Sequence, residues 1–107
     1  MFTRIVECYV KKEKRQEFAE KMQNLVLPIL QSQPGFVDLL ALSSEDEPER
    51  TVSISLWNSR ADAEKYHRAH FDEIVDAIRP SLRDEPSVEF YEVQASTAHR
   101  FALGKAA

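Results

Sequence analysis

The chain has 107 residues, of which 43% are hydrophobic and 30% are charged, and its formal net charge is −4. This length allows one domain with one core, and the composition is typical of a globular protein rather than a disordered chain. No apolar run approaches the ~18 residues that a membrane span needs, and the acidic balance without a basic stripe argues against membrane and nucleic-acid partners.

A strand and a long helix are predicted first. Residues 2–10 are rich in β-branched and aromatic side chains, which is typical of a strand. Glu7 is unusual in a strand interior, and we expect it to pair with a charge such as Arg4 or to lie at an interface. Over residues 12–32 the apolar side chains recur with the period of an amphipathic helix. We expect this helix to kink or loosen just before Pro28, because proline lacks an N–H and disfavours helical geometry at the preceding residue.

Two further strands are predicted as a hairpin. Residues 33–35 (QPG) are a turn signal, and residues 36–44 are apolar on both faces of the strand that they predict. After a polar loop over residues 45–50, the next strand alternates between two faces. Val52, Ile54 and Leu56 point one way, whereas Thr51, Ser53, Ser55 and Trp57 point the other way.

A second helix begins after Ser59, which is followed three residues later by Asp62 in a pattern resembling a capping box. The apolar stripe of this helix consists of Ala63, Tyr66, His67, His70, Phe71, Ile74, Val75 and Ile78. A break near residues 71–72 is one option, because Asp72 could cap a new turn. Pro80 marks the helix end.

A fourth strand is predicted over residues 87–95, and the following residues have no clear period. We therefore expect one domain over residues 1–96 and a C-terminal tail over residues 97–107, which could reach across to a partner subunit.

The element order β-α-β-β-α-β predicts an α+β, ferredoxin-like fold with a four-stranded antiparallel sheet and both helices on one face. The other face would then be bare and partly apolar. A patch of this kind marks an interaction surface, and a second copy of the same face would cover it. We expect a homodimer through the open sheet face, forming a dimeric α/β barrel.

Three segments carry a family resemblance: residues 33–36 (QPGF), residues 55–59 (SLWNS) and residues 63–67 (AEKYH). In this order and spacing, the chain resembles the antibiotic biosynthesis monooxygenase family of the dimeric α/β-barrel superfamily. The resemblance implies a cofactor-independent monooxygenase that binds a planar aromatic compound, assists loss of a phenolic proton and excludes water. It implies no metal or flavin.

A second branch of the family degrades haem, and the chain departs from its pattern. The resemblance implies an Asn on the first strand, a Trp late in the second helix and a His further on. The corresponding positions are Glu7 or Cys8, Tyr66 and Asp76. A haem-binding or haem-degrading relative is therefore a disfavoured alternative; the departure argues against haem degradation but not against haem or porphyrin binding.

The candidate site residues lie mainly on the second helix. His67 and His70 share its apolar face, and histidine can move a proton near neutral pH. We predict His67 and Tyr66 as catalytic residues, and Trp57, His70, Phe71 and Ile74 as substrate-binding residues. The alternative for each is ordinary packing: a hydrogen-bonded histidine in a core, or an aromatic ring in the sheet or dimer interface.

No metal or cofactor site is predicted. His67 and His70 could be half of a metal site, but no second ligand pair of diagnostic spacing follows. The chain has only two glycines, which excludes the glycine-rich phosphate loops that hold nucleotides. Its one cysteine, Cys8, allows no internal disulfide. With no secretory signal pattern at the start, we expect a cytoplasmic protein.

Three functions remain open at this point. The first is a cofactor-independent monooxygenase acting on an aromatic, polyketide-like or quinol-like small molecule. The second is a non-catalytic, dimeric ligand-binding or stress-associated protein. The third is a different reaction on the same scaffold, such as an isomerisation, because one fold hosts many chemistries.

Overall fold

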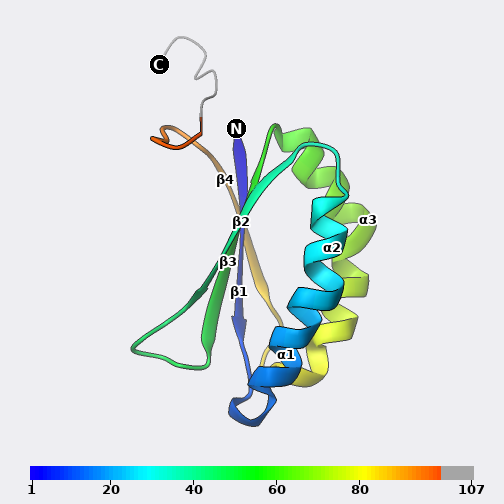
Figure 1. Cartoon of the computed structure of the whole chain (residues 1–107), viewed down its shortest axis with the longest axis vertical. Coiled ribbons are helices and arrows are strands. Elements are labelled where there is room, and N and C mark those ends of the chain that lie inside the picture. Colours follow the sequence, from blue (N-terminus) through cyan, green and yellow to red (C-terminus); the bar gives the residue numbers. More distant parts are fainter. Residues whose placement is uncertain (100–107) are drawn as a thin grey trace.

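The computed structural model describes residues 1–99, and these form two layers, a sheet and a helical layer (Figure 1). The strands are β1 (Phe2–Tyr9), β2 (Phe36–Ser43), β3 (Arg50–Trp57) and β4 (Ser87–Glu92). The helical elements are η1 (Lys12–Lys14), α1 (Arg15–Lys21), η2 (Met22–Val26), α2 (Leu27–Gln31), α3 (Arg60–Ile78) and η3 (Arg79–Ser81). The predicted reach of the tail towards a partner lies outside the described residues, and the division into a domain and a tail stays a prediction.

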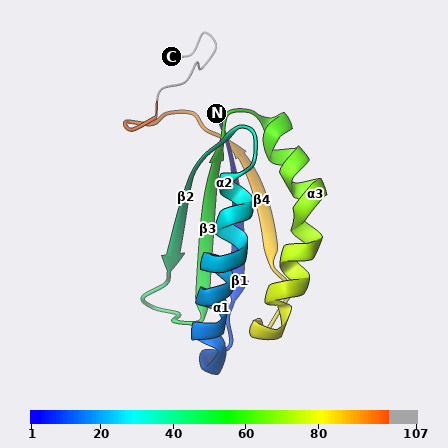
Figure 2. The same ribbon diagram turned by 45° about the vertical axis from the view of Figure 1, so that its right-hand side comes forward.

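The sheet has the spatial order β2-β3-β1-β4, and every neighbouring pair is antiparallel. Both long helical segments cover one face, as Figures 1 and 2 show. The predicted ferredoxin-like α+β fold is therefore confirmed. The fourth strand is shorter than predicted and ends at Glu92, because its partner β1 begins at Phe2, directly opposite. No helix of the described part of the chain is long and apolar enough to cross a membrane.

The first helix loosens one turn earlier than predicted. Residues 22–26 form a π-helical turn, in which the Leu27 N–H bonds to the Met22 carbonyl five residues back. Pro28 has no N–H to offer to the carbonyl of Asn24, and its ring crowds that carbonyl. The turn before the proline therefore widens, and the helix continues without ending.

The second helix is continuous from Arg60 to Ile78, so the break considered near residues 71–72 does not occur. Buried side chains continue in the same helical phase through Ile74 and Ile78, which keeps one straight helix in place. Ser59 is the N-cap, as predicted, because its side chain accepts a hydrogen bond from the Asp62 N–H.

The cap packs against the turn that leads into β2. Gly35 has a φ of 81°, and a Cβ built there would collide with the Asp62 side chain. The Asn58 N–H also donates to the Gly35 carbonyl, at 2.8 Å. The predicted QPG turn and the helix cap thus form one packed corner that only glycine fits.

The alternation of β3 predicted two faces, and the pairing with β1 shows which of them meets the helices. Arg4 pairs with Ser55, and Phe2 pairs with Trp57, so the hydroxyl-bearing face of β3 shares a side with the buried face of β1. The small hydroxyl side chains of β3 and Trp57 therefore face the helices, whereas Val52, Ile54 and Leu56 face away from them.

The face without helices is apolar and exposed. Leu40 is 51% exposed, Leu42 is 48% exposed and Tyr91 is 47% exposed. Leu40 lies opposite Ile54 in the sheet, and Ile54 in turn lies opposite Ile5. Glu7 is on this face too, and its carboxylate accepts a 2.7 Å hydrogen bond from Arg50. The pairing of Glu7 with Arg4 is wrong, because the two side chains leave opposite faces of β1.

Candidate active site

A cavity of about 500 Å³ lies between the helix-facing side of the sheet and the helical layer. One wall is apolar and comes from the first helical segment, including Phe18, Met22 and Val26. The opposite wall carries the small hydroxyl side chains of β3: Thr51, Ser53 and Ser55. The cavity exists because these small side chains, rather than Ile54 and Leu56, face the helices next to the first helical segment. Its volume suits a ligand of two or three fused rings.

Arg4 is a cavity-lining residue that the sequence reasoning missed. It sits in the middle of β1 and is only 4% exposed. Its Nε donates a 3.1 Å hydrogen bond to Nδ1 of His67. The guanidinium carbon lies 4.5 Å from the ring centre of Phe71 and 5.2 Å from that of Tyr66. The alternation of β1 was the available signal, because Arg4 is a charge on a face otherwise made of Phe2, Val6 and Cys8.

The charge of Arg4 is poorly compensated. Its Nη2 is buried and has no hydrogen-bond partner within residues 1–99. Burial lowers the pKa of this guanidinium, and the chief opposing influence is the Tyr66 hydroxyl rather than a carboxylate. A buried charge normally has a counter-charge or a complete set of hydrogen bonds. Arg4 has neither from the described chain.

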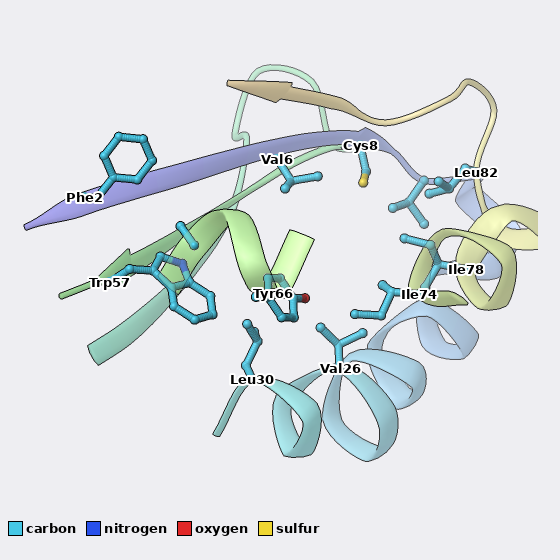
Figure 3. Close-up of a cluster of buried hydrophobic side chains, with 12 residues drawn as sticks. Phe2, Val6, Cys8, Val26, Leu30, Trp57, Tyr66, Ile74, Ile78 and Leu82 are labelled. Atoms are coloured by element: carbon cyan, nitrogen blue, oxygen red, sulfur yellow. The ribbon is translucent and has the colours of Figure 1, made fainter. Parts of the chain in front are cut away.

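Tyr66 also lines the cavity, as the prediction of a site role requires. The residue is 3% exposed, and its ring stacks on Trp57 with a centroid separation of 5.1 Å. Its hydroxyl points into the space surrounded by Val26, Cys8 and Ile74 (Figure 3). Burial raises the pKa of Tyr66, so this hydroxyl is a proton-bearing hydrogen-bond donor at neutral pH.

His67 lies behind Arg4 and is not among the residues that line the cavity. Its ring stacks on Phe71 at 4.6 Å and contacts the edge of Phe90 at 5.5 Å. Burial, together with the charge of Arg4, lowers the pKa of His67. The imidazole is therefore neutral at neutral pH, and its one acceptor nitrogen is occupied by Arg4. In this arrangement His67 holds Arg4, and accepting a proton would release it.

Of the other predicted residues, Phe71 and Ile74 line the cavity, whereas His70 and Trp57 do not. His70 instead lies 2.8 Å from the Glu73 carboxylate and 3.3 Å from the Gln33 amide.

Trp57 is completely buried, and its indole N–H donates to the Ser55 hydroxyl at 2.9 Å. His67, His70 and Trp57 thus do not converge on the cavity, and the roles predicted for all six residues stay predictions.

The thiol of Cys8 lies at the cavity wall, and burial raises its pKa to about 11. It is therefore a protonated, weakly nucleophilic side chain. Across residues 1–99 no three His, Cys, Asp or Glu side chains are placed to hold a metal ion.

The ferredoxin-like domain thus has a partly open, mostly apolar cavity large enough for a small organic molecule. Residues 1–77 match the family model described as antibiotic biosynthesis monooxygenase, so the chain belongs to this family. No curated protein sequence matches the chain significantly.

Solved structures show the same fold. A conserved protein of Methanosarcina mazei is 26% identical, with a TM-score of 0.72 and coverage of 85% of this chain and 91% of that one. The cofactor-independent oxygenase SnoaB of Streptomyces nogalater, solved as a mutant, is 17% identical, with a TM-score of 0.76 and coverage of 92% and 97%. A monooxygenase from the ActVA-Orf6 gene of Streptomyces coelicolor, in complex with nanaomycin D, is 18% identical, with a TM-score of 0.75 and coverage of 89% and 88%.

Proposed function

We propose that the protein is a cofactor-independent monooxygenase that oxidises a planar phenolic or hydroquinone-like compound in the cavity. The observation that carries the proposal is the buried, uncompensated guanidinium of Arg4 at the wall of an otherwise apolar cavity. Membership of the family supports the reaction class, and the ligand named for the Streptomyces coelicolor structure supports the substrate class.

The chemistry requires a substrate that supplies its own electrons. Dioxygen is a triplet and reacts slowly with closed-shell molecules, but a deprotonated phenol is electron-rich enough to reduce it by one electron. Arg4 would favour the deprotonated form, because its positive charge is stronger in a site that excludes water. Tyr66 would donate a hydrogen bond to a second substrate oxygen, and Phe71 and Ile74 would shape the pocket.

The atoms and electrons balance without a cofactor. The substrate anion gives one electron to dioxygen, and the resulting radical pair combines at a ring carbon to form a hydroperoxide. Loss of water then leaves a carbonyl. For a CH₂ carbon conjugated with the phenol, the sum is CH₂ + O₂ → C=O + H₂O, with all four electrons from the substrate.

The test is oxygen uptake by purified, metal-free protein with a panel of hydroquinones and polycyclic phenols. We expect saturable uptake that Arg4→Met abolishes and that Tyr66→Phe reduces by about tenfold or more, as for loss of one donor to a developing charge. Arg68, which is exposed on α3 and does not line the cavity, provides the control, and Arg68→Met should retain activity. No uptake across the panel, or uptake unchanged in Arg4→Met, would overturn the proposal.

The same assay tests the role predicted for His67. If His67 only holds Arg4, then His67→Ala lowers uptake but leaves its pH dependence set by the phenol. If His67 is the base, the acidic limb of the pH profile disappears in this variant.

One observation favours the non-catalytic alternative. Of the described residues that line the cavity, none is a carboxylate or an imidazole. A protein that only binds its ligand would show saturable binding by calorimetry without oxygen uptake, for the same compounds.

The proposal includes a homodimer through the open sheet face. Leu40 and Leu42 are exposed at the β2 edge of this face and Tyr91 at its β4 edge, and they would be covered by the same face of a second copy. Light scattering after size-exclusion chromatography should give a dimer mass. The double variant Leu40→Lys with Leu42→Lys should give a monomer mass, because it places two charges on the covered face.

A further inference from the structure

The guanidinium of Arg4 is held on three sides by neutral groups. The rings of Phe71 and Tyr66 contact its faces, and the neutral imidazole of His67 occupies its Nε. These contacts fix the plane of the guanidinium without balancing its charge. The Nη2 atom is left with no partner among residues 1–99, although Arg4 is only 4% exposed.

A buried guanidinium without a counter-charge favours anionic ligands. A planar guanidinium offers two parallel N–H groups, which match the two oxygens of a carboxylate or the single oxygen of a phenolate. Neutral acceptors gain much less from the same contact, because hydrogen bonds to charged groups are about twice as strong. The cost of burying the charge is recovered when an anion binds beside it.

The rest of the cavity sets the remainder of the ligand. The wall from the first helical segment, with Phe18, Met22 and Val26, accepts flat apolar surface. The hydroxyl wall of Thr51 and Ser53 can bond polar substituents along one edge. A ligand that satisfies both walls is an aromatic compound of two or three rings with one anionic oxygen group.

We infer that the Arg4 end of the cavity is an anion-binding subsite, that the protein binds its aromatic ligand as an anion, and that His67 is the positioning residue of this subsite. The inference rests on the proposed function in one respect: it takes the ligand of this cavity to be the aromatic substrate. Binding of an anion can be measured without turnover, so its failure and the failure of the oxygenase proposal are distinguishable.

The carboxylate arm of the test compares 2-naphthoate with the isosteric, neutral 2-naphthamide by calorimetry without dioxygen. The wild-type protein should bind naphthoate about tenfold or more tightly than naphthamide, as a charge-assisted hydrogen bond predicts. Arg4→Met should remove this preference and keep naphthamide binding, which also shows that the variant folds and retains the cavity. Arg68→Met is the matched control for a general effect of positive charge, because Arg68 is exposed and does not line the cavity, and it should keep the preference within about twofold.

The phenolate arm uses 4-nitrophenol, whose ionised form absorbs visible light. Binding to the wild-type protein should lower the apparent pKa of the phenol by about one unit, which corresponds to a tenfold preference for the anion. Arg4→Met should abolish this shift. His67→Leu should weaken it, whereas His67→Gln should restore part of it, because an amide oxygen can accept from Nε of Arg4.

Two results would overturn the inference. One is equal affinity of the wild-type protein for naphthoate and naphthamide together with an unshifted nitrophenol. The other is an anion preference that survives in Arg4→Met. A shift for nitrophenol without a preference for naphthoate would restrict the subsite to phenolates.

Discussion

Replacing Trp57 by phenylalanine separates its packing role from the ligand-stacking role predicted from the sequence. The indole is completely buried, contacts the ring of Phe36 at 5.5 Å and donates to the Ser55 hydroxyl. Trp57→Phe leaves a void that costs about 1–2 kcal/mol, and the lost hydrogen bond adds about 1 kcal/mol. The expected loss of unfolding free energy is therefore about 2–3 kcal/mol, or roughly 10–20 °C in Tm for a chain of this size.

The assay is chemical denaturation at fixed protein concentration, because an oligomer couples stability to concentration. Ser55→Ala and the double variant complete a cycle that isolates the hydrogen bond between the two side chains, with an expected coupling of about 1 kcal/mol. Below its Tm, the Trp57→Phe protein should bind naphthamide with wild-type affinity. Unchanged stability with a tenfold loss of affinity would refute the packing role and support contact between Trp57 and the ligand.

Three further outcomes follow from the same geometry. Because burial raises the pKa of Cys8 to about 11, its thiol should react roughly a hundredfold more slowly with a disulfide reagent in the folded protein than after unfolding, and bound ligand should slow it further. Because the pKa of His67 lies below its ordinary value of 6.5, the unfolded chain binds its proton more readily. The free energy of unfolding should therefore fall as the pH drops from 6.5 to the folded-state pKa and then level off, and His67→Gln should reduce this slope in pH-dependent denaturation. Ser53→Ile fills the cavity from a strand position that suits a β-branched residue, so naphthamide affinity should fall by roughly tenfold or more while Tm stays the same or rises; retained affinity would place the ligand elsewhere.

Local patterns accounted for most of the fold. The cap of Ser59 on Asp62 and the turn at Gly35 depend on neighbouring residues, so both were predictable from the chain alone. The order of strands and helices followed from where the apolar side chains change between the two-residue period of a strand and the 3.6-residue period of a helix. The position of the widened helical turn was harder to predict. Pro28 acts on a carbonyl one turn earlier, so the turn widens at residues 22–26, before the proline.

The site depended on contacts between distant segments. The alternation of β3 showed two faces but could not say which one met the helices, and that choice decides whether Ser53 lines the cavity or lies on the open face of the sheet. Arg4 and His67 are 63 residues apart, so their hydrogen bond left no local pattern. The spacing of His67 and His70 predicted one helix side for both. The packing of β1 against α3 gave His67 an arginine, whereas His70 pairs with Glu73 of its own helix. Periodicity along the chain therefore determined which residues share a face, whereas the pairing of those faces in three dimensions determined which of them meet, because a side chain's partners are set by long-range packing that no single segment encodes.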